Sequence, residues 1–233
     1  MSESVFDQSG QEIHGHQTNI AGDIYANQVN IAGSVHSYSG PAQDSGGIRR
    51  VRIFVASPGD VQAERERLQK IIQQMNRSTA RRLNLVLDLI RWETHSIPDM
   101  GRPQQVILEQ LTKFDWDIFI GILWLRFGTP SGAANNETGE DFESGTEEEF
   151  TFARSLRKVN ENGWPKIMMY RCGRPPAEMF SFDAQQSLKV ADFFNEFRAD
   201  GAHPGLVCHY MSVNDFEDTI REHLDNVLWE LGN

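Results

Sequence analysis

The stretch that most constrains the fold is Ile118 to Leu125, which is almost wholly apolar. It has the length of a strand and falls well short of the roughly 18–20 apolar residues that a membrane span needs. A strand that is apolar at nearly every position is typical of the centre of a parallel sheet, where helices cover both faces. The run therefore predicts an α/β protein with a buried central strand.

Strand-length and helix-length segments alternate on both sides of this run. Four further strands are expected, at Val51–Ala56, Leu85–Ile90, Ile167–Tyr170 and Leu206–Met211. Five helices are expected, at Val61–Met75, from Pro103 onward, at Gly145–Val159, at Gln186–Phe197 and through Phe216 to Leu231. This alternation predicts a doubly wound, five-stranded parallel sheet of flavodoxin-like order 2-1-3-4-5. Ligands of such sheets bind at the carboxyl ends of the strands, where strand order reverses.

The first 47 residues differ from the rest in composition. They are rich in Ser, Gly, Asn, Gln and His, and the segment Asn19–Asp23 returns as Asn30–Ser34, eleven residues later. Isolated apolar residues beside glycines predict short strands joined by turns. So small a piece buries too little apolar surface to be stable alone. We therefore divide the chain into a β-prone extension with a linker, 1–47, and an α/β domain, 48–233. The extension is either a self-association element or a flexible leader.

Composition narrows the class of protein. The net charge of −11 and the lack of a basic stripe argue against nucleic acid or an anionic membrane as partner. No secretory signal is evident, so we expect a soluble, cytoplasmic protein. Cys172 and Cys208 lie in strand-like runs and are expected to be reduced thiols. They have no His partners at zinc-ligand spacing, so no metal site is predicted.

The segment Ser57-Pro58-Gly59-Asp60 directly follows the first strand. Ser57 is expected to cap the next helix, with Pro58 at its first position and Asp60 completing a capping box. A helix N-terminus also leaves backbone N–H groups available to an anion. We therefore take these four residues as candidate substrate-binding residues, contacting a phosphate or a ribose.

A second cluster, Glu143 to Phe150, begins the helix after the third strand. Ser144 with Glu147 fits a capping box, and acidic residues in a first turn complement the helix dipole. Glu149, a few residues into the helix, can point into the same crevice as the first loop. Two carboxylates near one crevice raise each other's pKa. Glu149 and Glu143 are the candidate catalytic residues, with Ser144 and Thr146 as substrate-binding neighbours; a purely surface role for Glu149 is the alternative.

Aromatic residues mark two further loops of the same edge. Trp124, Arg126 and Phe127 end the third strand, and Trp92 follows the second. The aromatic rings could stack on a base or a nicotinamide ring, and Arg126 could contact phosphate. The alternative is that Trp124 and Phe127 simply close the core.

These motifs together resemble a known family. The stretch Arg52–Val61, with Glu64 and Arg65 after it, is similar to a TIR-like domain of unknown function that often stands at the N-terminus of bacterial STAND NTPases. The ending Ile122–Pro130 and the segment Ser144–Phe150 match it in the same order. The resemblance covers nearly all of residues 48–233. No P-loop of the form GxxxxGK[ST] is present, so any NTPase would be a partner protein.

Two groups of enzymes share this broad architecture, and both point at Glu149. Enzymatic TIR domains cleave NAD at the nicotinamide–ribose bond with a glutamate early in the helix after strand three. Nucleoside deoxyribosyltransferases carry Asp, any residue, Gly, three residues and the nucleophilic Glu. Glu143, Gly145 and Glu149 stand at those positions, with Glu in place of Asp at the first. The Trp that usually precedes the TIR glutamate by three or four residues is missing.

The resemblance implies three functional hypotheses. The first is an oligomeric effector of a bacterial defence or signalling system that cleaves NAD or a related nucleotide, with NAD as substrate and no cofactor. The second is a non-catalytic self-association or adaptor module that couples a sensor or a STAND NTPase to an effector. The third is a deoxyribosyltransferase-like enzyme.

Overall fold

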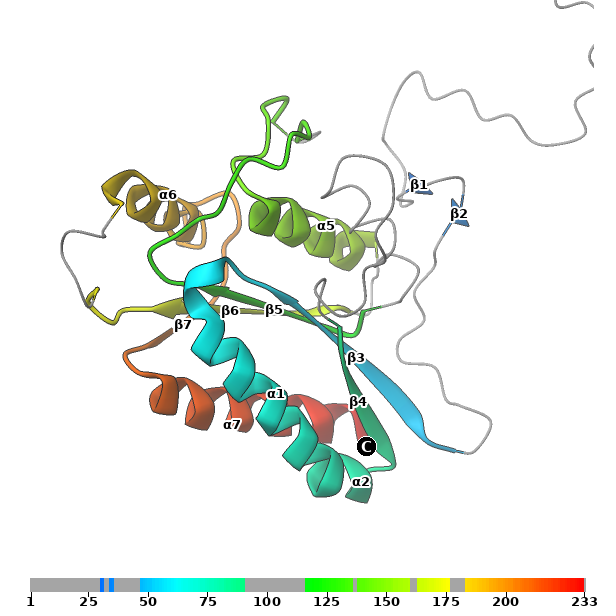
Figure 1. Ribbon diagram of the computed structural model, residues 1–233. Coiled ribbons are helices and arrows are strands. Elements are labelled where there is room, and N and C mark those ends of the chain that lie inside the picture. The colour runs from blue at the N-terminus through cyan, green and yellow to red at the C-terminus, as the bar shows by residue number, and fades with distance from the viewer. Residues whose placement is uncertain are drawn as a thin grey trace, which may run out of the picture.

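Five parallel strands form the central sheet in the computed structural model of the protein (Figure 1). The structure describes residues 30–31, 34–35, 47–90, 116–135, 138–159, 163–176 and 183–232. The strands of the sheet are β3 (Arg49–Ala56), β4 (Leu85–Ile90), β5 (Ile118–Leu123), β6 (Lys166–Cys172) and β7 (Val207–Tyr210). Their order is β4-β3-β5-β6-β7, and every neighbouring pair is parallel. The predicted doubly wound sheet of order 2-1-3-4-5 is thereby confirmed.

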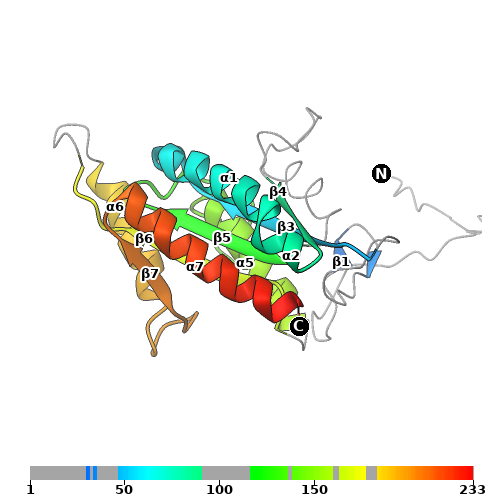
Figure 2. The same ribbon diagram turned by 90° about the horizontal axis from the view of Figure 1, so that it is seen from below.

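Helices cover both faces of this sheet. They are α1 (Gln62–Arg77), α2 (Thr79–Arg82), α5 (Gly145–Val159), α6 (Ala184–Asn195) and α7 (Val213–Gly232), and a short 3-10 helix, η1 (Gly59–Val61), precedes α1. The helices α1 and α7 lie side by side on one face, whereas α5 and α6 lie on the other (Figures 1 and 2). No helix in the described part of the chain is long and apolar enough to cross a membrane.

The core is split by the sheet into two clusters. One joins inward residues of β3, β4 and β5 to α1 and α7, and it includes Val51, Ile53, Leu68 and Leu224. The other joins the sheet to α5 and α6 and is rich in aromatic rings, with Phe54 stacked on Trp116 at a centroid distance of 4.3 Å. All six residues of β5 are buried, as its apolar run predicts.

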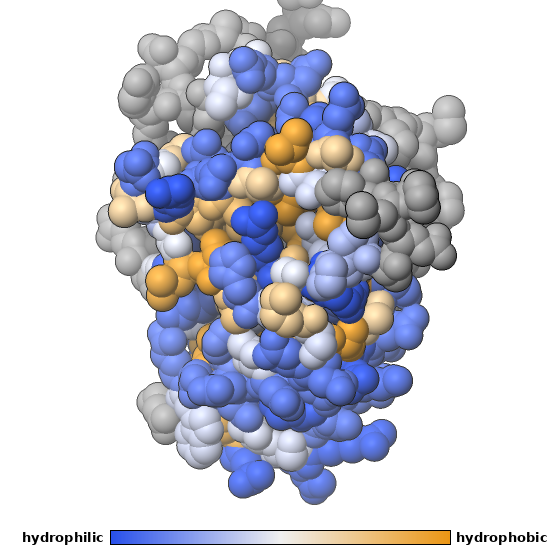
Figure 3. Space-filling model, turned by 90° about the vertical axis from the view of Figure 1, so that its left-hand side faces the viewer, coloured by the Kyte–Doolittle hydropathy of each residue, from blue (hydrophilic) through white to orange (hydrophobic). Residues whose placement is uncertain are grey.

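The register places the carboxyl ends of β3 and β5 together. Ile53 pairs with Ile118 and Ala56 pairs with Gly121, so the two strands end at the same edge of the sheet. The chain passes from β3 to β4 on one side and then to β5 on the other, so strand order reverses here. Figure 3 faces this edge, where hydrophilic side chains are set among hydrophobic ones.

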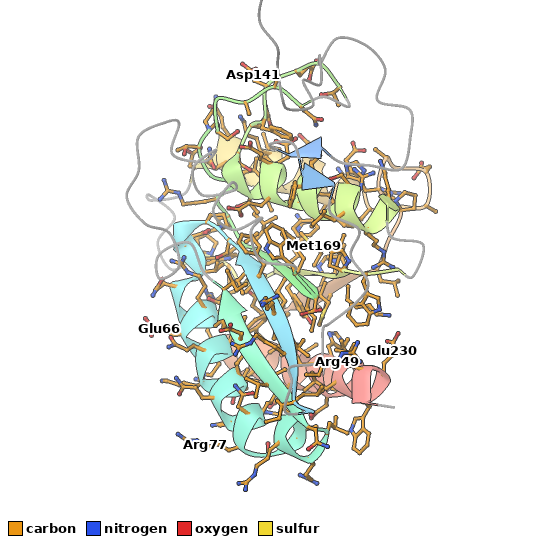
Figure 4. The ribbon with its side chains drawn as sticks, turned by 90° about the vertical axis from the view of Figure 1, so that its right-hand side faces the viewer. Arg49, Glu66, Arg77, Asp141, Met169 and Glu230 are labelled. Atoms are coloured by element: carbon orange, nitrogen blue, oxygen red, sulfur yellow. The ribbon has the colours of Figure 1, made fainter. Side chains whose placement is uncertain are left out.

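The opposite, amino edge is closed by the C-terminal helix. The Arg49 side chain at the start of β3 donates a 2.7 Å hydrogen bond to the Leu231 carbonyl of α7. Figure 4 shows Arg49 beside Glu230 at this edge and Met169 between the helix layers. The amino edge thus carries a structural contact. The carboxyl edge is where ligands of such sheets bind.

Three predictions concern the N-terminal extension, the segment between β4 and β5, and the two cysteines. Two short strands, β1 (Asn30–Ile31) and β2 (Ser34–Val35), pair antiparallel within the N-terminal extension. The helix expected from Pro103 and the loop that contains Trp92 lie outside the described residues. Cys172 in β6 and Cys208 in β7 carry no disulfide.

Candidate functional site at the carboxyl edge

The loop after β3 does not cap its helix in the predicted way. The first helical element is η1, its N-cap is Pro58, and no side chain caps it. Helix α1 then begins after Val61, again without a side-chain cap. The predicted capping box of Ser57 and Asp60 is therefore wrong, because the 3-10 turn moves the helix start past both side chains. The Ser57 hydroxyl is buried and bonds to no described residue.

The Asp60 carboxylate fixes the segment that leaves β5. Its Oδ2 atom accepts hydrogen bonds from the backbone N–H groups of Leu125, at 3.0 Å, and Arg126, at 2.9 Å. Its Oδ1 atom is buried without a hydrogen bond to a described residue. Charge-assisted bonds of this kind are among the stronger ones in proteins. Asp60 thus links the two loops that flank the point of strand reversal.

Gln186 holds the same segment from the other side. Its Oε1 atom accepts hydrogen bonds from the Phe127 N–H at 2.8 Å and the Gly128 N–H at 3.0 Å. Gln186 lies in the first turn of α6, where Asp183 accepts its backbone N–H. No motif in the sequence marks Gln186 as part of the site. The one signal in the sequence is Asp183, an N-cap residue type that marks the start of α6 and so places Gln186 in the first turn of that helix.

Gly128 brings the β5 exit against the start of α5. Its φ is +111°, in the left-handed region that favours glycine, and a Cβ atom there would lie 3.2 Å from the Ser144 Cβ atom. A larger residue at this position would separate the two segments. The loop after β5 and the first turn of α5 therefore form one surface.

The start of α5 carries the predicted capping interactions. The Ser144 hydroxyl accepts the Glu147 N–H at 3.0 Å, and the Glu147 carboxylate accepts the Glu143 N–H at 2.8 Å. This differs from the usual capping box only in that the carboxylate reaches Glu143 instead of Ser144. Burial raises the pKa of Glu147 and the nearby Glu143 charge raises it further, while these backbone bonds and Lys189 oppose the shift.

Glu149 and Glu143 occupy different environments. Glu149 is 6% exposed, and Ala153, four residues further along α5, belongs to the core cluster that packs on the sheet. Glu149 therefore lies on the sheet-facing side of the helix, close to its N-terminus. Glu143 is at the surface and pairs with Lys189 at 3.2 Å. The two candidate carboxylates thus differ in exposure, one being buried and the other at the surface.

The first turns of α5 hold further buried polar residues. Ser144, Thr146 and Glu148 are all less than 10% exposed. Carboxylates are rarely buried in this way unless they are paired or hydrogen-bonded. Glu148 and Glu149 are the fourth and fifth residues of α5, where a helix N-terminus favours carboxylates.

The three residues at the end of β5 have three different surroundings. Phe127 is 3% exposed and packs on Phe193 of α6, so it belongs to the core and presents no face to a ligand. Arg126 is exposed. Trp124 is half-buried; its Nε1 atom donates a 2.6 Å hydrogen bond to the Arg174 carbonyl, and the Arg174 guanidinium lies 4.2 Å from its ring.

No metal-binding constellation accompanies these groups. Within the described ranges, no three His, Cys, Asp or Glu side chains are close enough together to hold a metal ion.

The fold and this edge define the class of protein: a doubly wound α/β domain whose candidate site lies where strand order reverses. Within that class, the family model named Domain of unknown function (DUF4062) matches residues 52–225, and the chain belongs to this family. The match begins in β3 and ends in α7, so it includes every element that forms the edge. No curated protein matches the chain.

Proposed function

We propose that this protein is a TIR-like effector that cleaves the nicotinamide–ribose bond of NAD or of a related nucleotide, with Glu149 as the catalytic carboxylate. The observation that carries the proposal is the burial of Glu149 on the sheet-facing side of α5, at the edge where strand order reverses. A carboxylate at this edge lies where ligands of doubly wound sheets bind.

The chemistry of NAD cleavage needs few groups. The nicotinamide of NAD is a cationic pyridinium that leaves as a neutral amide, so no general acid has to protonate it. The transition state resembles an oxocarbenium ion, which a nearby carboxylate stabilises or attacks. In this proposal Glu149 has that role, and the exit segment of β5, held by Asp60 and Gln186, forms the wall against which the nucleotide lies.

The remaining candidate residues take supporting roles. Ser57 supplies a buried hydroxyl that bonds to no described residue, and Gly59 is exposed next to it. Ser144 and Thr146 lie at the start of α5, and Arg126 is exposed at the exit of β5. Asp60 acts through Leu125 and Arg126 instead of contacting the nucleotide with both oxygens.

The biological setting belongs to the same proposal. The TIR-like and STAND-associated character rests on the three sequence motifs, and it suggests a cytoplasmic signalling or antiphage defence protein that works as a homo-oligomer. A STAND NTPase or another sensor protein would be its partner. The substrate is NAD or a related nucleotide, and neither a cofactor nor a metal takes part.

One observation favours a second function, a non-catalytic assembly module. Asp60, Gln186 and Ser144 all use oxygen atoms to hold backbone N–H groups of the edge, and Phe127 is buried in the core. Asp60, Ser144 and Phe127, which the sequence predicts as binding residues, thus have structural tasks of their own. A deoxyribosyltransferase-like enzyme is a weaker alternative, because Glu143 is paired with Lys189 at the surface.

The test of the proposal is NAD consumption by the purified full chain, with and without a crowding agent. We expect the wild type to release nicotinamide and the Glu149→Gln variant to lose at least about a hundredfold in rate, the usual loss for a key electrostatic group. Glu148→Gln is the matched control, since it removes the same charge from an adjacent buried residue.

Two outcomes would contradict the proposal. Equal loss in both variants would mean that removing either buried carboxylate damages the helix start, and it would remove Glu149 from catalysis. No NAD turnover by an assembled wild type, verified by gel filtration, would favour the assembly module.

A further inference from the structure

A buried charge on the other side of the β5 exit has no part in the proposed chemistry. Glu64, in the first turn of α1, is 0% exposed, and neither of its carboxylate oxygens has a hydrogen bond to a described residue. Burial of a charged carboxylate is costly unless donors compensate it. Native proteins contain few such groups, and each calls for an explanation.

The charged partner of Glu64 in the described part of the chain is Arg174. Its Nη1 atom lies 3.4 Å from Glu64 Oε1, which is longer than the roughly 2.7–2.9 Å of a strong charge-assisted hydrogen bond. Arg174 stands just after β6, and its side chain retains 30% of its exposure. The Arg174 side chain therefore faces the buried carboxylate and still has access to solvent.

Trp124 fixes Arg174 in this position. The indole donates to the Arg174 carbonyl, and the guanidinium stacks on the indole ring at 4.2 Å. Such stacking orients a planar cation over the ring face. Three elements thus meet at one guanidinium: α1 through Glu64, the exit of β5 through Trp124, and the end of β6.

The surroundings of this guanidinium contain other polar groups with few bonds. The Tyr210 hydroxyl, at the end of β7, is buried and has no geometrically sound hydrogen bond to a described residue, and the Cys172 thiol lies near it. Burial, and then the nearby Cys172 and Glu64 groups, raise the pKa of Tyr210. Tyr210 therefore stays neutral and keeps a hydroxyl hydrogen to donate.

We propose that Arg174 is an anion-binding residue of the carboxyl edge, that it receives a phosphate group of a nucleotide, and that Glu64 and Trp124 are its positioning residues. A guanidinium presents N–H groups in a fork that matches a phosphate. Held by Glu64 and by the indole ring, it loses little side-chain freedom on binding.

This subsite lies on the α1 side of the β5 exit, whereas Glu149 lies on the α5 side. A dinucleotide crossing the edge would place its phosphates near Arg174 and its glycosidic bond near Glu149. The inference rests on the proposed function only in taking the ligand to be a nucleotide, because phosphate binding by Arg174 needs no catalysis.

The experiment measures binding of ADP-ribose and of inorganic pyrophosphate to the full chain by titration calorimetry at two salt concentrations. We expect Arg174→Gln to weaken binding of both probes by at least about tenfold, as loss of a charge-assisted bond implies. It should also reduce the salt dependence of binding. Arg174→Lys, which keeps the charge but loses the fork, should fall between. Arg198→Gln, at an exposed arginine after α6, is the matched control and should bind like the wild type.

Glu64→Gln separates positioning from simple charge. Removing a negative charge near an anion site should strengthen binding on electrostatic grounds alone, whereas a lost positioning contact should weaken it. We expect binding about threefold weaker or more, with thermal unfolding showing that the variant is folded at the assay temperature.

The outcomes are distinguishable from those of the NAD assay. Wild-type turnover of NAD with unchanged ADP-ribose binding by Arg174→Gln and Arg174→Lys would overturn this inference and leave the proposed function standing. Binding that depends on Arg174, without any NAD turnover, would support the inference and not the proposed function. If the wild type binds neither ADP-ribose nor pyrophosphate, the phosphate site is overturned. If Glu64→Gln binds the probes more tightly than the wild type, the positioning role of Glu64 is overturned.

Discussion

The Glu147 carboxylate stabilises the start of α5 through a hydrogen bond, but its burial disfavours the charged form. The carboxylate accepts the Glu143 N–H, yet burial and the Glu143 charge raise its pKa above the ordinary value of 4.5. The folded protein therefore holds this proton more tightly than the unfolded chain does. The contribution of Glu147 to stability is largest below pH 4.5 and is lost as the pH rises through its folded pKa.

Glu147→Gln tests this sign, because glutamine keeps an acceptor for the Glu143 N–H without the charge. We expect the free energy of unfolding of the wild type, minus that of the variant, to fall as the pH rises through the interval just above 4.5 and then to level off. Urea unfolding from pH 4 to pH 7 measures it. Glu147→Ala should lose about 1 kcal/mol relative to Gln at every pH. A difference that grows with pH would mean that the hydrogen bond outweighs burial.

Residue-scale prediction from the sequence succeeded where the partners are close along the chain. Ser144 and Glu147 are three residues apart, so their bond follows from a local motif. The Ser57 and Asp60 cap failed, because the partners of Asp60 are the backbone groups of Leu125 and Arg126, which only the tertiary fold brings near. The role of Gln186 and the pairing of Glu64 with Arg174 were not predicted for the same reason, since their partners are distant in the sequence.

At the scale of elements, the Asn76 side chain adds a polar link between α1 and the edge strand β4. The Asn76 amide donates to the Leu87 carbonyl at 2.8 Å and accepts the Leu87 N–H at 2.7 Å. In the described sheet β4 is an edge strand, so Asn76 supplies the pairing that a further strand would otherwise give.

Asn76→Ala should therefore destabilise the domain by about 1–3 kcal/mol, since two backbone groups lose their partner. Urea or thermal unfolding of the full chain measures the change. Gln73→Ala, on an exposed position of the same helix, is the control and should stay within about 0.5 kcal/mol of the wild type. An Asn76→Ala variant as stable as the control would show that water replaces the amide at this edge.

The elements themselves were largely predictable. β5 is buried on both faces and therefore reads as a continuous apolar run. Helices α1 and α7 are buried on one face and therefore show apolar residues at helical spacing. The ends of the elements were less predictable. The apolar run continues to Leu125, but β5 stops at Leu123, because Trp124 bonds to Arg174 and Leu125 bonds to Asp60. Such tertiary contacts leave no periodic signal.

At the scale of the whole molecule, the N-terminal repeat offers a way to separate assembly from folding. The α/β domain has two core clusters of its own, built from residues between Val51 and Leu231. If strands of the extension associate between copies, their isolated apolar side chains are the groups that association would bury.

The double variant Ile20→Asp, Ile31→Asp in the full chain should therefore lose assembly and keep its fold. Charges at both positions oppose strand pairing between copies, since each would have to be buried unpaired. We expect light scattering to show mainly monomer under conditions where the wild type assembles, with the same thermal unfolding midpoint. Ser4→Asp, Ser9→Asp adds equal charge outside the repeats and should leave assembly intact. If the double variant assembles like the wild type, association must depend on the α/β domain, and the search for its interface moves to the edge strands β4 and β7.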